Sequence, residues 1–278
     1  MGPAADLAAR LGYAADARLV IVNADDLGLC HAANVGVYES LHSGGATSAT
    51  IMVPCAWARD AAARYRGEDV GVHLTLTAEW ELYRWGPITH APSLLGGDGG
   101  FASTAEDLWD HADLDEVRRE CRAQIERAIL WGFDVSHLDS HMDVLERRPE
   151  FFDVYLELAA EFCLPVRIAS TRRGERLGFP AAEVAADAGV LCVDRVVSLH
   201  RPHDPPLPEC IAGLAPGITE LRLHPAVDAP ELRAIASDWR ARVEDHRLAC
   251  DPDGLRKQLE AAGARIIGYR ALRDLVAG

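Results

Sequence analysis

The stretch Leu19-Val20-Ile21-Val22-Asn23-Ala24-Asp25-Asp26-Leu27-Gly28 joins an apolar, strand-like run to two adjacent carboxylates and a glycine. Neighbouring carboxylates repel each other, so this pair requires a compensating interaction. A divalent cation would supply one, because its charge outweighs the repulsion while it binds one acid and leaves the other to move a proton. The alternative is a solvated Asp-Asp turn that only ends a strand.

A single histidine interrupts a second apolar segment, residues 69–76 (DVGVHLTL). With the period of two that a strand imposes, His73 shares its face with Gly71 and Thr75, and the opposite face is entirely aliphatic. The imidazole is therefore expected on the less apolar side of a strand. A core histidine that is satisfied by its neighbours is the alternative for a lone His.

A third segment, VSHLDSHMD, contains the alternating polar residues His137, Asp139 and His141. In an extended chain these side chains point the same way. One of the two histidines, with Asp26 and His73, would provide two nitrogens and one oxygen. Three protein ligands leave a coordination position open, as in catalytic rather than structural metal sites. Imidazole suits Zn, Fe, Ni or Cu, and a carboxylate also admits Mg or Mn.

Size and charge narrow the classes of function. The chain has 278 residues and a mass of 30.2 kDa, and α/β barrels of this size commonly form one unit. Its 28 basic and 43 acidic residues give a net charge of −15. This acidity argues against a nucleic-acid or anionic-membrane partner, because both require clustered Lys and Arg.

Cysteine usage and the N-terminus indicate the compartment. The seven cysteines are odd in number, have no Cys-x-x-Cys spacing and lie mostly in apolar segments, as expected for thiols in a reducing environment. The N-terminus lacks the apolar core of a secretory signal, and no run reaches the roughly 18 apolar residues of a membrane span. We therefore predict a cytoplasmic protein.

Strand-like runs alternate with helical segments, which is typical of a parallel sheet with crossover helices. The predicted strands are 19–23, 48–53, 70–76, 135–139, 166–169, 190–193, 218–223 and 265–267. The clearest helix covers about 114–131, and another begins near Pro149. We expect one catalytic domain over residues 1–278, an α/β fold forming a distorted, TIM-barrel-like (β/α) barrel of about seven to eight parallel strands. An open, doubly wound sheet is the alternative.

The candidate chemical groups share one position relative to these strands. Asp25, Asp26, His73, His141 and His224 lie at, or just after, the carboxyl ends of predicted strands. In α/β barrels and open sheets this edge is where residues distant in sequence converge into a site.

Two irregular stretches are expected near that edge. Residues 79–113 form a long insertion that contains Trp80, Trp85 and a glycine cluster at 96–100. Loops of this length are usually lids or disordered excursions. Their aromatic rings could stack on sugar rings or anchor the loop to the barrel. The second stretch, 200–206, follows the sixth predicted strand and is expected to line the same mouth.

Several motifs resemble those of a known family, the YdjC-type carbohydrate deacetylases, which include chitooligosaccharide deacetylase. The matching segments are 19–28, 71–76, 136–141, 223–226 and 268–274. They occur in order over nearly the whole chain, and the Asn-Ala-Asp-Asp-Leu-Gly opening with the His-Leu-Asp-Ser-His block is specific. The resemblance implies a distorted (β/α) barrel and a metal-dependent hydrolase that removes acetyl from an N-acetylated sugar.

The resemblance also implies roles for individual residues. Asp26, His73 and His141 would bind the metal, and Asp25 would be the catalytic base. His224, in a Leu-His-Pro setting, is similar to the late histidine that protonates the leaving group. One divalent ion is implied: Zn²⁺ is favoured by Asp-His-His ligation, and Mg²⁺ has been linked with the family.

The remaining polar residues of the third motif would lie around the ligands. His137 and Asp139 are expected to support the metal site or contact substrate. The chain departs from the family pattern after His141, where it continues Met142-Asp143 instead of with further histidines. This difference and the loop rich in glycine and tryptophan leave the identity of the sugar open.

Two other functions remain compatible with the sequence. A metal phosphoesterase would use a similar His/Asp set with basic residues for phosphate, for which Arg84 and Arg167 are candidates. A barrel that binds carbohydrate without catalysis is the second, although a binder has no need of a spare carboxylate. The expected partner is a small carbohydrate, with no nucleic acid or membrane, and homo-oligomerisation is open.

Overall fold

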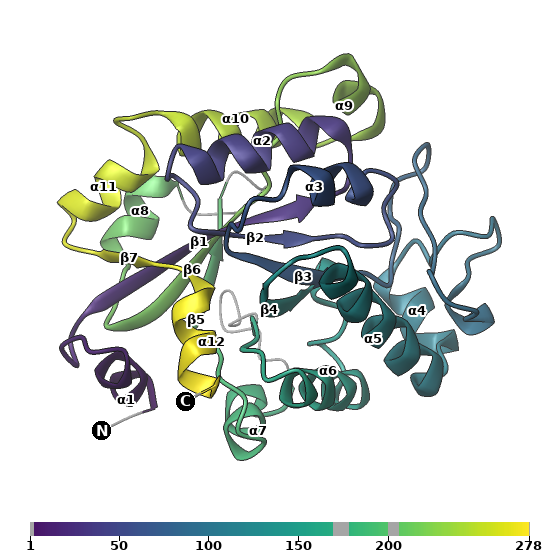
Figure 1. Ribbon diagram of the computed structural model, residues 1–278, viewed down its shortest axis with the longest axis horizontal. Coiled ribbons are helices and arrows are strands. Elements are labelled where there is room, and N and C mark those ends of the chain that lie inside the picture. Colours follow the sequence, from purple (N-terminus) through teal and green to yellow (C-terminus); the bar gives the residue numbers. More distant parts are fainter. Residues whose placement is uncertain (1–2, 169–177, 200–205, 278) are drawn as a thin grey trace.

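The computed structural model describes residues 3–168, 178–199 and 206–277 (Figure 1). Within them, parallel strands form one sheet in the order β4-β3-β2-β1-β6-β5, and β7 pairs with β1. The strands are β1 (Arg18–Leu27), β2 (Ser48–Ile51), β3 (Val70–Leu74), β4 (Val135–Ser140), β5 (Arg195–Ser198), β6 (Gly217–Leu223) and β7 (Arg265–Ile267). This all-parallel α/β arrangement confirms the predicted fold class.

Single-residue bridges continue the pairing beyond β4. Leu138 of β4 pairs in parallel with Val166, and Val166 pairs in parallel with Cys192, which lies three residues before β5 begins. Both edges of the sheet are thus connected through short, irregular segments, in agreement with a distorted (β/α) barrel.

Helices surround the sheet, as βα crossovers require (Figure 1). They are α1 (Pro3–Arg10), α2 (His31–His42), α3 (Ala58–Arg64), α4 (Ala105–His111), α5 (Leu114–Leu130), α6 (Pro149–Glu161), α7 (Ala181–Asp187), α8 (Leu207–Ala212), α9 (Pro230–Ile235), α10 (Trp239–Cys250), α11 (Leu255–Ala261) and α12 (Tyr269–Ala277), with short 3₁₀ helices η1 (Pro92–Leu94) and η2 (His141–Asp143).

Helix α5 forms as its sequence predicts. The side chain of Asp113 accepts hydrogen bonds from the backbone N–H groups of Asp115 and Glu116, which caps the first turn. Its apolar residues recur at helical spacing, so that Val117 and Ile125 are buried against the sheet. The second predicted helix is also confirmed, because α6 begins at Pro149.

The predicted strands differ from the structure in the second half of the chain. The predicted strand 190–193 is wrong, because only a bridge forms at Cys192 and the strand β5 begins at Arg195. The predicted strand 166–169 is represented by the bridges of Val166, and residue 169 lies outside the described residues. Most of the irregular stretch 200–206 also lies outside them. Short apolar runs define a strand's existence better than its boundaries.

The expected insertion, residues 79–113, lies beyond the carboxyl ends of β1, β2 and β3 and contains η1 and α4 (Figure 1). Its aromatic residues anchor it: Trp85 is buried and donates from Nε1 to the carbonyl of Thr77 at 2.8 Å, and the Tyr83 hydroxyl donates to the carbonyl of Leu29 at 2.6 Å. These contacts fix the insertion against the strand ends.

A buried carboxylate on α5 holds the same insertion. Glu120 accepts hydrogen bonds from the backbone N–H groups of Ile88 and Thr89, at 3.1 and 2.9 Å. One turn later, Gln124 bonds both the N–H and the carbonyl of Thr75, directly after β3. Helix α5 therefore positions both the end of β3 and the insertion that follows it. None of the helices in the described segments is long and apolar enough to cross a bilayer.

Candidate metal centre and active site

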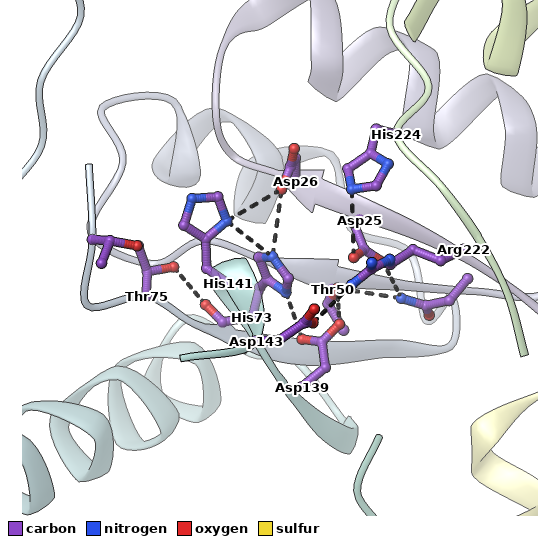
Figure 2. A network of polar contacts seen from close by, with 12 residues as sticks. Asp25, Asp26, Thr50, His73, Thr75, Asp139, His141, Asp143, Arg222 and His224 are labelled. Atoms are coloured by element: carbon purple, nitrogen blue, oxygen red, sulfur yellow. Dashed lines mark hydrogen bonds and ion pairs between the residues drawn. The ribbon is translucent and has the colours of Figure 1, made fainter. Parts of the chain in front are cut away.

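Three side chains from three strand ends converge at the edge of the sheet (Figure 2). Asp26 Oδ1 lies 3.5 Å from His73 Nε2 and 3.9 Å from His141 Nδ1, and the two imidazole nitrogens are 3.3 Å apart. All three residues are buried. The structure thus brings together the oxygen and two nitrogens that the sequence predicts as metal ligands, and they form a group that could hold an ion.

The strand ends determine this convergence. Asp26 is the penultimate residue of β1, His73 is the penultimate residue of β3, and His141 follows β4 directly. His137 and Asp139 are within β4, whereas His141 is the first residue of η2 and lies just after the strand, as the sequence predicted. The short helix η2 changes the direction of the chain directly after β4.

Backbone strain accompanies the site. Asp26 has a φ of 69°, and Met142 and Asp143 have φ values of 58° and 56°. Non-glycine residues rarely adopt this left-handed region, and such conformations cluster at functional sites. Asp26 and the two residues that follow His141 thus adopt conformations of a kind that is enriched at functional sites.

One oxygen of Asp26 fits a cation. Asp26 Oδ2 accepts a 2.6 Å hydrogen bond from Arg242, whereas Oδ1 is buried and receives no hydrogen bond from any part of the chain that the structure describes. A buried acceptor without a partner is costly. Because Oδ1 faces two imidazole nitrogens that can also act as ligands, a divalent cation would satisfy it.

Carboxylates hold both histidines by the nitrogen that faces away from Asp26. His73 Nδ1 lies 2.7 Å from Asp139 Oδ1, and His141 Nε2 lies 2.9 Å from Glu79 Oε2. If each of these nitrogens donates its proton to the carboxylate, the other nitrogen is left as a lone-pair donor directed at the site. Such outer partners orient metal-binding histidines and raise their basicity.

Charged neighbours control ionisation in the metal centre. Burial opposes ionisation of Asp26, but Arg242 and the two histidines hold its pKa well below the usual range. Burial also opposes a charged His73, but Asp139, with Asp25 and Asp26, raises the pKa of His73 to about 9. Without a cation, a proton on His73 therefore partly neutralises the surrounding carboxylates.

The neighbouring acid, Asp25, is held differently. Arg167 donates to both of its oxygens, at 2.7 Å to Oδ2 and 2.6 Å to Oδ1, and Asn23 donates to Oδ1 at 2.9 Å. Burial opposes its ionisation, yet Arg167 keeps the pKa of Asp25 far below its ordinary value. Asp25 is thus an ionised carboxylate beside the candidate metal centre and is not one of its three clustered donors.

Arg167 pairs with three buried carboxylates around the site. Besides Asp25, it lies 2.8 Å from Asp139 and 2.5 Å from Glu220, and it is completely buried. The sequence suggested Arg167 and Arg84 as phosphate ligands, but Arg84 is also paired, with Asp98 at 2.6 Å. Both guanidinium groups are therefore engaged by carboxylates.

A second group of potential ligands, Asp25, His73 and Asp139, also lies close together. Its members already neutralise one another, because His73 contacts Asp139 and Arg167 contacts both acids. These internal ion pairs account for that group without an ion.

The structure also places the candidate acid at this edge. His224 directly follows β6, and its Nε2 atom lies 3.8 Å from Asp25 Oδ2 (Figure 2). Its backbone N–H donates to Asp245 of α10 at 2.8 Å, which fixes the start of the following loop. His224 and Asp25 therefore lie side by side, next to the three donors.

His137 takes no part in this cluster. Its ring stacks on Tyr269 with centroids 3.6 Å apart, and burial lowers its pKa far below the ordinary value. Gly71, on the adjacent strand, makes room for it, because a Cβ at residue 71 would lie 2.4 Å from the His137 carbonyl oxygen. The structure thus groups His141, rather than His137, with Asp26 and His73.

Sequence reasoning missed three residues around the site: Glu79, Arg242 and Glu220. Each is a charged residue in an otherwise unremarkable segment, and Glu220 interrupts an apolar strand. A charge within a predicted buried strand is a usable signal, since lone buried charges are rare unless paired. Glu79 and Arg242 carry no comparable signal.

With this geometry in hand, comparison with known proteins identifies the family. A family model described as YdjC-like protein matches residues 19–261, which include every residue of the metal centre. The chain belongs to the YdjC-like family. This membership confirms the resemblance seen in the sequence motifs.

Two curated relatives match nearly the whole chain, and a third matches about half of it. A protein from Thermus thermophilus named carbohydrate deacetylase is 36% identical over 97% of this chain and 98% of its own length. A carbohydrate deacetylase of Geobacillus stearothermophilus is 33% identical over 93% and 99%. A chitooligosaccharide deacetylase of Yersinia pestis is 34% identical over 54% of this chain and 59% of its own.

A solved structure shares the fold of this family member. It is a protein from Enterococcus faecalis V583 whose proposed role is cellobiose-phosphate cleavage, with a TM-score of 0.80 and 24% identity. It covers 92% of this chain and 99% of its own. At this identity the likeness supports the fold alone.

Proposed function

We propose that the protein is a metal-dependent carbohydrate deacetylase that hydrolyses the N-acetyl group of an amino sugar or oligosaccharide. The observation that carries the proposal is the buried Asp26 Oδ1, which receives no hydrogen bond within the described segments and faces His73 Nε2 and His141 Nδ1, with a fourth group, ionised Asp25, beside them. The names of the relatives in the YdjC-like family support the substrate class.

The ligands Asp26, His73 and His141 would hold one divalent ion. When bound, such an ion polarises a carbonyl group and lowers the pKa of water. Two imidazoles and one carboxylate suit Zn²⁺, our preferred ion, better than Mg²⁺, which prefers oxygen donors. The buried ion pairs Arg242–Asp26, Asp139–His73 and Glu79–His141 would keep the three donor atoms in place.

Asp25 would accept the proton of the attacking water. Arg167 fixes its orientation and keeps it ionised across the working pH range. The low pKa makes it a weak base, so proton acceptance depends on an acidic water and a fixed geometry. His224, 3.8 Å from Asp25, would give a proton to the departing amine, and the neighbouring carboxylate would stabilise its charged form.

Other features fit a cytoplasmic location. No disulfide joins the cysteines of the described segments, and burial raises the pKa of Cys30 and Cys192 to about 11. These thiols are inert, as expected for structural cysteines under reducing conditions.

Acetate release from a panel of N-acetylated mono- and oligosaccharides, with and without a chelator, tests the proposal. We expect release from at least one sugar, its loss with chelator, and its recovery on adding Zn²⁺. Faster turnover of a chromogenic phosphate ester than of every acetamido sugar would instead support a phosphoesterase. Tight sugar binding without acetate release at full metal loading would support a binding protein.

A further inference from the structure

A cavity of about 420 Å³ opens within the insertion, next to the metal centre. Its walls come from residues 79–81 and 84, from the glycine-rich turn at 96–98, and from Ser103 and Asp107 near the start of α4. The volume lies in the range of small-molecule sites, roughly 300–1,000 Å³. Glu79 belongs both to this wall and to the metal centre, because its Oε2 atom contacts His141.

An aromatic ring forms part of the wall. Trp80 is half-buried, and Arg242, which binds Asp26, lies over its ring at 5.3 Å from the centroid. Trp85 meets Trp80 edge-on at 5.9 Å and is itself 6.1 Å from the His141 ring. The rings thus join the cavity to two of the candidate ligands. Indole rings are common contacts for the apolar faces of sugars because they are large, rigid and polar at one edge.

The cavity carries a net negative charge. Four carboxylates line it, from Glu79, Glu81, Asp98 and Asp107, against the single guanidinium of Arg84. Arg84 is bound by Asp98 through two contacts of 2.6 and 3.2 Å, and it also donates to the carbonyl of Phe101. Its charge is therefore neutralised within the wall.

The carboxylates of Glu81 and Asp107 account for the negative charge of the cavity that Arg84 does not neutralise. Glu81 and Asp107 are exposed, and Asp107 Oδ1 lies 3.2 Å from Nδ1 of the His111 imidazole on the same helix. A ring that carries a phosphate or carboxylate would be repelled here. An ammonium group would be attracted.

From these observations we propose that the cavity is a second sugar subsite. It holds the ring next to the acetylated one in an oligosaccharide substrate, and it favours a ring with a free ammonium group over an acetylated or anionic ring. Trp80 provides an apolar part of the wall, and Glu81 and Asp107 provide the attraction. This inference rests on the proposed deacetylase function, since it names the neighbour of the ring that is deacetylated.

The proposed subsite is tested by steady-state acetate release from three substrates. These are N-acetylglucosamine, its acetylated disaccharide, and a disaccharide in which the second ring is glucosamine. The measured quantity is the ratio of kcat/KM for the mixed disaccharide to that for the fully acetylated one. We expect a ratio above one that falls at least about threefold in the double variant Glu81→Gln/Asp107→Asn, the size expected for two exposed charge contacts. The matched control is Glu106→Gln/Asp110→Asn, on the same helix but outside the wall.

A ratio that is equal in the parent, double variant and control would overturn the subsite. Absence of acetate from all three substrates would instead refute the proposed deacetylation of these sugars. Calorimetric binding of the fully deacetylated glucosamine disaccharide needs no turnover, so it tests the cavity separately. The affinity for this disaccharide should be lower in the double variant than in the parent, and it should fall at high salt. Equal affinity in the double variant and the control would refute the inference, even if the protein had no deacetylase activity.

Discussion

Arg167 binds both carboxylate oxygens of Asp25 in a fork, with its two terminal nitrogens 2.7 and 2.6 Å from Oδ2 and Oδ1. The two residues are 142 positions apart in the sequence and are both buried. Planar pairing of this kind fixes orientation as well as charge. It distinguishes Asp25 from Asp26, whose Oδ1 is left facing the histidines.

Replacing Asp25 by Asn should remove the proton acceptor while keeping the shape of the site. We expect a rate loss of roughly 10²–10⁴, the usual contribution of a general base. Metal content should stay at the parent level, because Asp25 is not among the three clustered donors. Acetate release and elemental analysis measure the two effects. Hydrolysis at the parent rate would rule out Asp25 as the base.

The two histidines of the third motif should behave differently. His141→Ala removes a donor that lies 3.9 Å from Asp26 Oδ1, so we expect both bound metal and activity to be lost. His137→Ala removes a ring stacked on Tyr269 and should lower stability while the metal is retained. Elemental analysis of both purified variants decides between them, and full metal content in His141→Ala would show that another residue is the ligand.

Glu79→Gln should weaken the metal site without abolishing it. The amide can still accept a hydrogen bond from His141 Nε2 but supplies no charge, and loss of such an outer partner typically costs about 10–100-fold in affinity. Competition with a chromogenic chelator measures the dissociation constant. Glu106→Gln, exposed on α4, is the matched control. Equal affinities in the two variants would mean that Glu79 does not support the ligand.

The proton on His73 predicts a pH dependence of metal binding. Its pKa is raised from 6.5 to about 9 in the metal-free fold, so at pH 7.5 a cation must displace this proton, whereas the proton is progressively lost as the pH rises through about 9. We expect release of about one proton per ion at pH 7.5. Calorimetry in two buffers of different ionisation enthalpy measures it. Buffer-independent heats at pH 7.5 would contradict a protonated His73.

The raised pKa of His73 also predicts how the stability of the metal-free protein depends on pH. A raised folded-state pKa stabilises the fold fully below the unfolded value of 6.5, and this contribution is lost as the pH rises through about 9. Chemical denaturation in chelator at pH 6 and pH 9.5 compares the two conditions. Asp139→Asn removes the partner of His73 and should reduce this difference.

Gly71 should tolerate no side chain. A Cβ there would lie 2.4 Å from the His137 carbonyl oxygen, so Gly71→Ala forces β3 and β4 apart, and overpacking of this kind typically costs about 1–3 kcal/mol or more. Gly97→Ala is the control, because a Cβ at that residue meets no atom within 4 Å. Urea denaturation of both variants gives the free energies of unfolding. Equal stabilities would contradict the tight contact.

Local patterns predicted much of the fold. The apolar run that ends at Asp25-Asp26 and the helical period of 114–131 correspond to β1 and α5, because strand and helix periodicity are local properties. The displaced strand at Arg195–Ser198 shows the limit, since its pairing with β6 decides where it begins.

The sequence by itself determined which groups could meet. Because parallel strands place their carboxyl ends at one edge, Asp26, His73 and a histidine after the fourth predicted strand were expected at the same edge once the strands were recognised. The residue types indicated a metal site, and the family motifs added the choice of His141 over His137 as its second histidine.

Only the tertiary structure decided how each group is held. Arg242 reaches Asp26 across 216 residues and Glu79 reaches His141 across 62, and no local pattern specifies either contact. These pairs form because the wrapping of helices and insertion around the sheet brings charges into a buried space, where each must find a partner. The ionisation and orientation of the site residues, and the Asp26 oxygen that receives no hydrogen bond within the described segments, follow from that long-range packing.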